Sequence, residues 1–350
     1  MAKGESKMPN TAHHPSSRST AKKFGLSSRK VSIWSRIVLM AISLQAISAN
    51  AAYPDRPIKW IVPSAASGAS DTTVRIVADQ LSKRLGQPVI IDNRPGASGA
   101  IGLDLLAKSA PDGYTIGTIN ITNFVMNRQL RPNLPFDVDR DFIPLVRLST
   151  QSNLLVVNPS LPINDVNELV AYSKAHPSSL FYGSAGAGSS QHIAMEFLKQ
   201  ITGASLTHIP YKSSPAAGID LMGNRVQVML DNLSTLAPNV KSGKIRALAL
   251  TAPKRSALLP DVPTFIEAGF PSLQMTVWSG VATPNGVDPE ITKMLSDEIL
   301  AVLKLPSVIA SLKETGYEPD GLRGSDFVEF IKQENTQWGD VIHKANIEPD

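Results

Sequence analysis

A glycine- and serine-rich segment in the middle of the chain has the composition of an anion-binding loop. Residues 182–192, called the second loop below, read Tyr-Gly-Ser-Ala-Gly-Ala-Gly-Ser-Ser-Gln-His and lead directly into a segment with helical apolar spacing. The first N–H groups of a helix have no intrahelical acceptor, and glycines leave room for a ligand to approach them. We expect ligand contacts from Ser184, Gly188, Ser189 and Ser190. The same residues also suit a tight strand-to-helix turn with a serine N-cap.

A catalytic function of this segment is less favoured than anion binding. Ser189, His192 and Asp231 supply the residue types of a hydrolase triad, but Ser189 and His192 share one helical turn and no G-x-S-x-G elbow is present. The dinucleotide motif G-x-G-x-x-G fails because its third glycine falls at Gln191. After residue 51 the histidines show no paired spacing for a metal. We therefore expect no enzyme, cofactor or metal, with a secreted hydrolase kept as the weaker alternative.

Another segment of the same kind lies upstream of the second loop, between an apolar strand and a helix. Residues 64–71, called the first loop, read Ser-Ala-Ala-Ser-Gly-Ala-Ser-Asp. We hypothesise that the two loops face each other across one site. The expected contacts from the first loop are Ser67, Gly68, Ala69, Ser70 and Asp71. Asp71 also suits a helix cap, since a carboxylate repels an anionic ligand.

Four further residues are candidates for the same site. Asn120 follows a predicted strand, His192 lies in the first turn of its helix, Tyr211 can form a wall, and Asp231 ends a strand where it can pair with an ammonium group. For each of them a structural role stays open: a turn or cap for Asn120, packing for His192 and Tyr211, and an internal hydrogen bond for Asp231.

The spacing of apolar residues predicts strands that alternate with helices, which indicates an α/β protein built from parallel βαβ units. Three helices without intervening strands follow residue 288, so we expect them to pack back onto the first sheet. Two crossings, near 148–157 and 274–281, would then join two lobes around a cleft. Strands are predicted at 58–62, 89–91, 114–119, 154–157, 180–182, 207–210, 226–231 and 245–250, an extended segment at 274–282, and the last helices at 288–304, 306–316 and 324–345. The predicted lobes are 53–152 with 277–350, and 153–276.

The N-terminal segment has the pattern of a secretory signal peptide. Basic residues up to Arg36 precede the apolar run 37–44, and Ala49-Asn50-Ala51 fits the small-x-small rule for cleavage before Ala52. The run is shorter than the ~20 residues that a membrane anchor needs. We therefore predict residues 1–51 to be a signal peptide and the mature protein to be periplasmic.

Composition narrows the function further. The sequence contains no cysteine, which excludes disulfides and thiol chemistry. The formal charge of +4 depends on the leader, which holds eight Lys or Arg and one Glu; the remaining 26 basic and 29 acidic residues give −3. A negative charge without basic clusters argues against nucleic acid binding. We expect a monomer with a small-molecule ligand.

An ordered set of short motifs then resembles the tripartite tricarboxylate transporter substrate-binding family, also called the Bug proteins. The resemblance covers residues 53–348. The motifs are Pro-Ile-Lys-Trp-Ile-Val-Pro at 57–63 with Asp71, Asn-Arg-Pro-Gly-Ala at 93–97, Pro-Asp-Gly-Tyr at 111–114, Gly-Ser-Ser-Gln-His at 188–192, Pro-Tyr-Lys at 210–212, Gly-Lys-Ile-Arg-Ala-Leu-Ala at 243–249 and Pro-Asp-Val-Pro-Thr at 260–264.

The resemblance implies an extracytoplasmic solute receptor with the two-lobed α/β type II periplasmic-binding-protein fold and a hinged central cleft. Such receptors bind di- or tricarboxylates, acidic amino acids or aromatic acids through two loops, which map onto 66–71 and 184–190, and they serve a two-subunit membrane permease. A receptor for a membrane signalling protein is the alternative. The chain departs from the family pattern in the first loop, with one glycine at Gly68, and at Ser213 in place of a glycine.

Overall fold

The computed structural model describes residues 53–66 and 69–348. The predicted signal peptide, its cleavage site before Ala52, and the first-loop residues Ser67 and Gly68 lie outside the described residues. Within the described ranges, no helix has both the length and the apolar character that crossing a bilayer requires.

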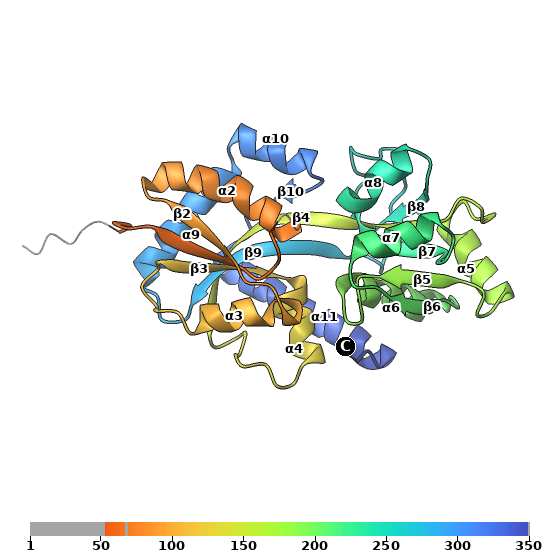
Figure 1. The fold of residues 1–350 in the computed structure, drawn as a ribbon, viewed down its shortest axis with the longest axis horizontal. Coiled ribbons are helices and arrows are strands. Elements are labelled where there is room, and N and C mark those ends of the chain that lie inside the picture. The colour runs from red at the N-terminus through yellow and green to blue at the C-terminus, as the bar shows by residue number, and fades with distance from the viewer. Residues whose placement is uncertain (1–52, 67–68, 349–350) are drawn as a thin grey trace, which may run out of the picture. The chain divides into compact units, whose positions relative to one another are not determined.

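The described strands form one mixed sheet, in the order β2-β1-β3-β9-β4-β7-β5-β6, with β8 and β10 also paired to β4 (Figure 1). β1, β2 and β3 are parallel, as are β5, β6 and β7, whereas β9 and β4 run antiparallel to their neighbours. The strands are β1 (Ile58–Val62), β2 (Val89–Asn93), β3 (Thr115–Asn120), β4 (Phe142–Val157), β5 (Phe181–Ser184), β6 (Thr207–Pro210), β7 (Val228–Asn232), β8 (Arg246–Leu250), β9 (Thr276–Pro284) and β10 (Glu318–Pro319).

β4 is the strand that joins the two halves of the sheet. Its residues up to Ser152 pair with β9, and its residues from Asn153 onward pair with β7 and β8. The sequence predicted a strand only at 154–157; the structure shows that these are the last four residues of a 16-residue strand. The first half of the sheet therefore holds β1, β2, β3 and β9, and the second half holds β5 to β8. The lobe boundaries at 152 and 277 stay a prediction.

Alternation of side chains along the strands divides the core into layers. Ile61 belongs to a different core cluster from its neighbours Trp60 and Val62, and Leu155 is separated in the same way from Leu154 and Val156. Successive residues of a strand point to opposite faces of a sheet, so helices must cover both faces. Figure 1 shows α2 and α10 on one side of the first half and α3 and α4 on the other.

The helices follow the predicted positions closely after the first loop. α11 packs on β4, and it also contacts α6 of the second half, because Gln200 donates to the carbonyl of Val341 at 2.9 Å and Phe197 meets Trp338 edge to face. The helices are α2 (Ala69–Leu85), α3 (Ala100–Ala107), α4 (Asn127–Leu130), α5 (Val166–Ala175), α6 (Ser190–Thr202), α7 (Ser214–Met222), α8 (Leu233–Lys241), α9 (Pro289–Leu303), α10 (Pro306–Glu314) and α11 (Gly324–Ala345), with short turns η2 (Ala97–Gly99) and η3 (Ile121–Met126).

The helical segment that follows β3 was not predicted. The π-helical turn η3 continues into α4, so that 121–130 is helical throughout. Asn120 and Asn123 cap its start reciprocally, each side chain accepting from the backbone N–H of the other. Asn-x-x-Asn is a local cap signature, but a single turn of π-helix leaves no apolar periodicity to detect.

Candidate functional site

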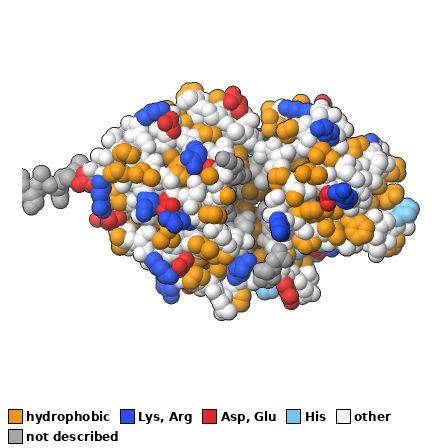
Figure 2. Space-filling view, in the orientation of Figure 1, with side chains coloured by type: hydrophobic (Ala, Val, Ile, Leu, Met, Phe, Trp, Pro, Cys, Tyr) orange, Lys and Arg blue, Asp and Glu red, His pale blue; other side chains and the backbone are white. Residues whose placement is uncertain are grey.

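A cavity of about 390 Å³ brings together residues of both halves of the sheet and of both loops. Figure 2 shows a hollow in the surface between the elements of the first half of the sheet and those of the second half. The residues that line the cavity are Pro63, Ser70, Ser98, Asn120, Ile121, Thr122, Arg131, Gln151, Ala185, Gly186, Ala187, Ser189, Ser190, Gln191, Asn232, Val277, Trp278, Ser279 and Tyr317. Four of the predicted site residues are in this set: Ser70, Asn120, Ser189 and Ser190.

The second loop ends as the N-terminus of α6. Ser189 is the N-cap, and its Oγ accepts from the backbone N–H of His192 at 3.3 Å. Ser190 and Gln191, the first two residues of the helix, therefore carry N–H groups that have no intrahelical acceptor. Both residues line the cavity. The positive end of α6 is thus directed at the space where a ligand fits.

Gly188 has a structural role within the second loop. Its backbone N–H donates to Nδ1 of His192 at 3.1 Å, so the loop itself uses the donor that we expected a ligand to use. The φ angle of Gly188 is +71°, and a Cβ built there would lie 2.6 Å from Cδ1 of Leu130. Gly188 is consequently the point at which the second loop packs against α4, and it is not among the residues that line the cavity.

Ser184 and His192 lie behind the loop and hold its shape. Oγ of Ser184 contacts Nε2 of His208 at 2.7 Å and also receives the N–H of Gly186. The imidazoles of His192 and His208 are stacked at 3.8 Å, and Tyr182 stacks on His208. Neither Ser184 nor His192 lines the cavity. These predicted contact residues form a second layer under the loop.

The hydrogen bonds of Ser189, His192 and Asp231 do not join these residues into a catalytic triad. Nδ1 of His192 accepts the Gly188 N–H, while Oγ of Ser189 is bonded to the backbone of His192 and not to its ring. Asp231 bonds to Gln191 and to the backbone of Asn232, both at 2.7 Å. Among the described residues, no group of three His, Asp or Glu side chains is placed to hold a metal ion.

In the first loop, Ser70 lines the cavity from the first turn of α2, while Asp71 does not. The Asp71 carboxylate is 1% exposed and accepts from Arg75 at 2.7 and 3.0 Å and from Asn93 at 2.9 Å. These bonds fix the start of α2 against the end of β2. Ala69 is the first residue of α2.

Asp231 and Tyr211 also lie outside the cavity lining. Asp231 is fully buried, and burial raises the pKa of its carboxyl group. The hydroxyl of Tyr211 donates to Asp220 at 2.8 Å, and its ring packs against the core under α7 and α8. Asn120 does line the cavity, although its Oδ1 is engaged as the cap of η3.

Comparison with known proteins decides the family. Residues 73–347 match the model of the tripartite tricarboxylate transporter family receptor. This chain belongs to that family. It is 35% identical to the protein BugT of Bordetella pertussis over 299 residues, which is 84% of this chain and 90% of BugT. The resemblance inferred from the ordered motifs is therefore confirmed.

Solved structures confirm the fold prediction for the receptor. A structure of Rpa4515 from R. palustris with adipate has a TM-score of 0.76 at 35% identity, covering 85% of this chain and all of the other. A structure of MatC from Rhodopseudomonas palustris with bound malate has a TM-score of 0.71 at 28% identity, covering 83% of this chain and all of the other. The receptor has the α/β fold of this group of binding proteins.

Several cavity residues of the receptor were missed by sequence reasoning. Nε2 of Gln151, Oδ1 of Asn232 and the hydroxyl of Tyr317 are buried and have no hydrogen-bond partner among the described residues. Buried polar groups are nearly always paired, so three unpaired groups around one cavity indicate a ligand or water that pairs them. Burial raises the pKa of Tyr317 to about 12 and the neighbouring Gln151 side chain lowers it, so these two side chains face each other at the cavity.

Trp278 connects the receptor's cavity to a buried acid. Its indole Nε1 donates to Oε2 of Glu334 in α11 at 3.1 Å, and its ring meets Phe327 edge to face. Burial raises the pKa of Glu334 to about 7. The sequence predicted an extended segment around Trp278, and the register β4–β9 places Trp278 opposite Thr150.

Proposed function

We propose that this receptor captures a small carboxylate in the periplasm and delivers it to a two-subunit permease of the tripartite tricarboxylate type. The observation that carries the proposal is the pair of uncommitted N–H groups at Ser190 and Gln191, which belong to the first turn of α6 and line the cavity. A helix N-terminus binds an anion through these donors and its dipole.

The rest of the cavity supports an anionic ligand with several acceptor atoms. Ser70 brings the first turn of α2 to the same space, and Nε2 of Gln151 and the Tyr317 hydroxyl, neither of which has a hydrogen-bond partner among the described residues, add donors from other segments. The relatives with solved structures hold adipate and malate, which are both small dicarboxylates. The receptor is in this proposal a binding protein and not an enzyme.

Delivery requires a change that a membrane partner can detect. A ligand that contacts residues of both halves of the sheet favours the arrangement in which these halves are close. Ser70 and Asn120 belong to the first half, and Ser190 and Asn232 belong to the second. Closure on the ligand is thus the signal that we propose the permease recognises, and export by the N-terminal signal peptide places the receptor where it can meet it.

A thermal-shift screen of the purified protein tests the proposed ligand class. The panel holds mono-, di- and tricarboxylates, acidic amino acids and aromatic acids. A ligand present at about 100 times its Kd should stabilise the protein by about 2.7 kcal/mol. If no carboxylate in the panel raises the melting temperature, the proposed function is wrong.

A pair of variants at Ser190 tests the role of the backbone donor. Proline is tolerated at the first position of a helix, so Ser190→Pro removes the N–H and keeps α6. Ser190→Ala keeps the N–H and removes only the hydroxyl, which makes it the matched control. We expect the proline variant to lose carboxylate binding by at least tenfold relative to the alanine variant. Equal affinities would show that the Ser190 N–H does not contact the ligand.

A further inference from the structure

The cavity has an uneven charge distribution. Among the described residues that line it, Arg131 is the only charged one; the others are apolar, or are neutral serines, amides, one threonine and one tyrosine. The helix N-termini of α2 and α6 supply partial positive charge to the cavity through Ser70, Ser190 and Gln191. Arg131 adds a full positive charge that the binding of a single carboxylate at the α6 N-terminus does not require.

The position of Arg131 is fixed by its neighbours in the chain. It caps the C-terminus of α4 with φ −123° and ψ 93°, and Pro132 after it favours this extended conformation. Leu130 packs on Gly188 of the second loop, and Asn127 donates to the carbonyl of Ser98 at 3.0 Å. α4 is therefore held between the second loop and η2, which sets Arg131 beside both.

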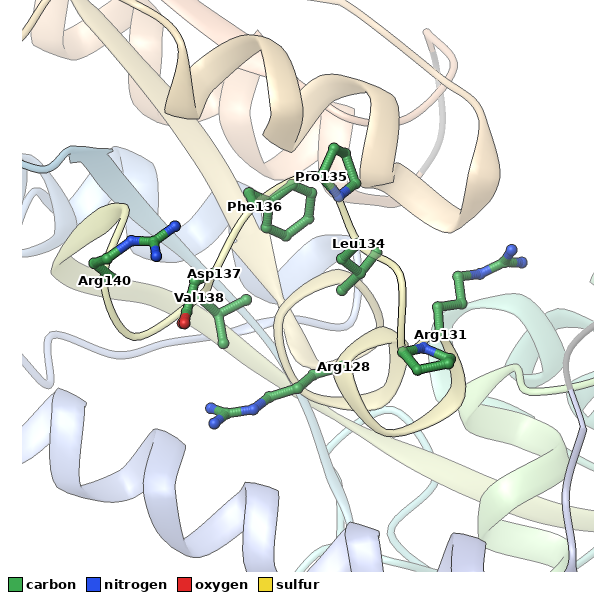
Figure 3. Close-up of a pocket in the computed structure, with 9 residues that line it drawn as sticks. Arg128, Arg131, Leu134, Pro135, Phe136, Asp137, Val138 and Arg140 are labelled. Carbon is green, nitrogen blue, oxygen red and sulfur yellow. The ribbon is translucent and has the colours of Figure 1, made fainter.

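Arg131 is also the arginine of this segment that lacks an acidic partner within the described ranges. Arg128 pairs with Asp139 at 2.6 Å and Arg140 pairs with Asp141 at 2.8 Å. Figure 3 shows the Arg131 side chain directed away from the other labelled side chains of the 128–140 segment. Its Nε is buried and has no hydrogen-bond partner among the described residues. A guanidinium offers five donors in a planar fork that matches a carboxylate.

We propose that Arg131 binds the second carboxylate of the ligand and makes the receptor selective for dicarboxylates over monocarboxylates. The proposal rests on the proposed function, because it assigns the first carboxylate to the N-terminus of α6. One carboxylate then accepts from Ser190 and Gln191, and the other pairs with Arg131. Nε2 of Gln151 and the Tyr317 hydroxyl are donors for the part of the ligand between the two carboxylates.

Asp231 is an acid that is bonded to two residues of this cavity. Asp231 lies behind Gln191 and Asn232, which both line the cavity while Asp231 does not. Its carboxyl is fully buried and is bonded to those two residues. Oδ1 of Asp231 accepts from the Gln191 amide and from the Asn232 backbone N–H, and burial raises the pKa of the carboxyl, which favours its neutral form beside an anionic ligand.

The test compares ligands of equal length that differ by one charge. Calorimetry measures the affinity of the protein for α,ω-dicarboxylates of four to seven carbons and for their monoamides, in which an uncharged amide replaces one carboxylate. A charge-assisted bidentate pair is about twice as strong as a neutral hydrogen bond. We expect the dicarboxylate of preferred length to bind at least about tenfold more tightly than its monoamide.

Arg131→Gln should bring this ratio close to one while leaving the monoamide affinity within about threefold of the parent. Arg128→Gln is the matched control, since it removes the same charge three residues away, from a side chain that pairs with Asp139 and does not line the cavity. It should keep the parent ratio, and circular dichroism confirms that both variants fold.

The outcomes separate this inference from the proposed function. If neither the dicarboxylates nor their monoamides bind while another carboxylate of the thermal-shift panel does, the assignment of Arg131 is overturned and the proposed function stands; if no carboxylate of either set binds, the proposed function fails. If both bind and the ratio is near one in the parent, or survives in Arg131→Gln, the assignment of Arg131 is overturned and carboxylate capture by the α6 N-terminus stands. A ratio lost equally in Arg128→Gln would indicate long-range charge and would also overturn the assignment.

Discussion

Protonation of Glu334 should control the stability of the receptor in the neutral pH range. Its carboxyl is 9% exposed, it accepts from Trp278, and burial raises its pKa from 4.5 to about 7. The unfolded chain releases this proton near pH 4.5, whereas the folded protein keeps it until about pH 7. Because the folded state binds more protons between these values, the free energy of unfolding falls as pH rises from 4.5 to 7 and is level above.

The size of the effect follows from the two pKa values. A difference of about 2.5 in pKa corresponds to about 3 kcal/mol, which is an upper bound because the surroundings relax around a charged carboxylate. Glu334→Gln removes the titration and keeps an oxygen that accepts from the Trp278 indole. We expect this variant to be more stable than the parent at pH 8, by up to about 3 kcal/mol, and to approach the parent near pH 5.

Urea unfolding at pH 5, 6, 7 and 8 measures this difference. Glu329→Gln is the control, because Glu329 is an exposed acid on the same helix. It should leave the slope of stability against pH unchanged. If the curves of the parent and Glu334→Gln run parallel across this range, the buried carboxyl does not titrate as described and the reasoning fails.

Two further predictions concern the packing of the second loop and one residue of the cavity. Gly188→Ala forces a side chain into a left-handed backbone conformation and against Leu130, so urea unfolding should show that it lowers the free energy of unfolding by about 1–3 kcal/mol. Leu130→Ala frees the space that the new side chain needs. The double variant should therefore lose less stability than the sum of the losses in the two single variants. Tyr317→Phe removes a hydroxyl that is buried without a partner, so the unliganded protein should be as stable as the parent or about 1 kcal/mol more stable, while carboxylate affinity measured by calorimetry falls. A loss of stability without loss of affinity would place the hydroxyl in the fold and not in the site.

Local sequence patterns were sufficient to predict the general order of strands and helices. The short apolar strands 58–62 and 226–231 and the three C-terminal helices follow from apolar spacing, and the N-cap at Ser189 follows from residue type. β4 was the exception, because its first part carries Pro144, Arg147 and Gln151 among apolar residues. Those residues are tolerated since β9 and β10 pair with the strand and α11 covers it, which only the tertiary structure reveals.

The site was readable only in part, for a related reason. Local sequence identifies a helix N-terminus, so Ser189 and Ser190 could be predicted to face a ligand. Local sequence does not say which N–H groups of the loop are bonded within the protein. The N–H of Gly188 is not available to a ligand because the His192 ring folds back to accept it. Gln151, Asn232 and Tyr317 come from three segments that are distant in sequence, and no spacing rule brings them together.

In the arrangement that we propose, two kinds of donor share ligand recognition. We assign the carboxylate that every ligand of the proposed class contains to the backbone N–H groups at the start of α6. Arg131 caps the C-terminus of α4, and α4 packs on the second loop through Leu130 and Gly188, so we expect that the Arg131 side chain can be exchanged without altering that loop. Changes in residues 184–190 should therefore affect all carboxylates alike, whereas changes at Arg131 should affect only those that carry a second negative charge. A receptor built in this way can change its ligand by substitution at α4 while the anion-binding helix end remains the same.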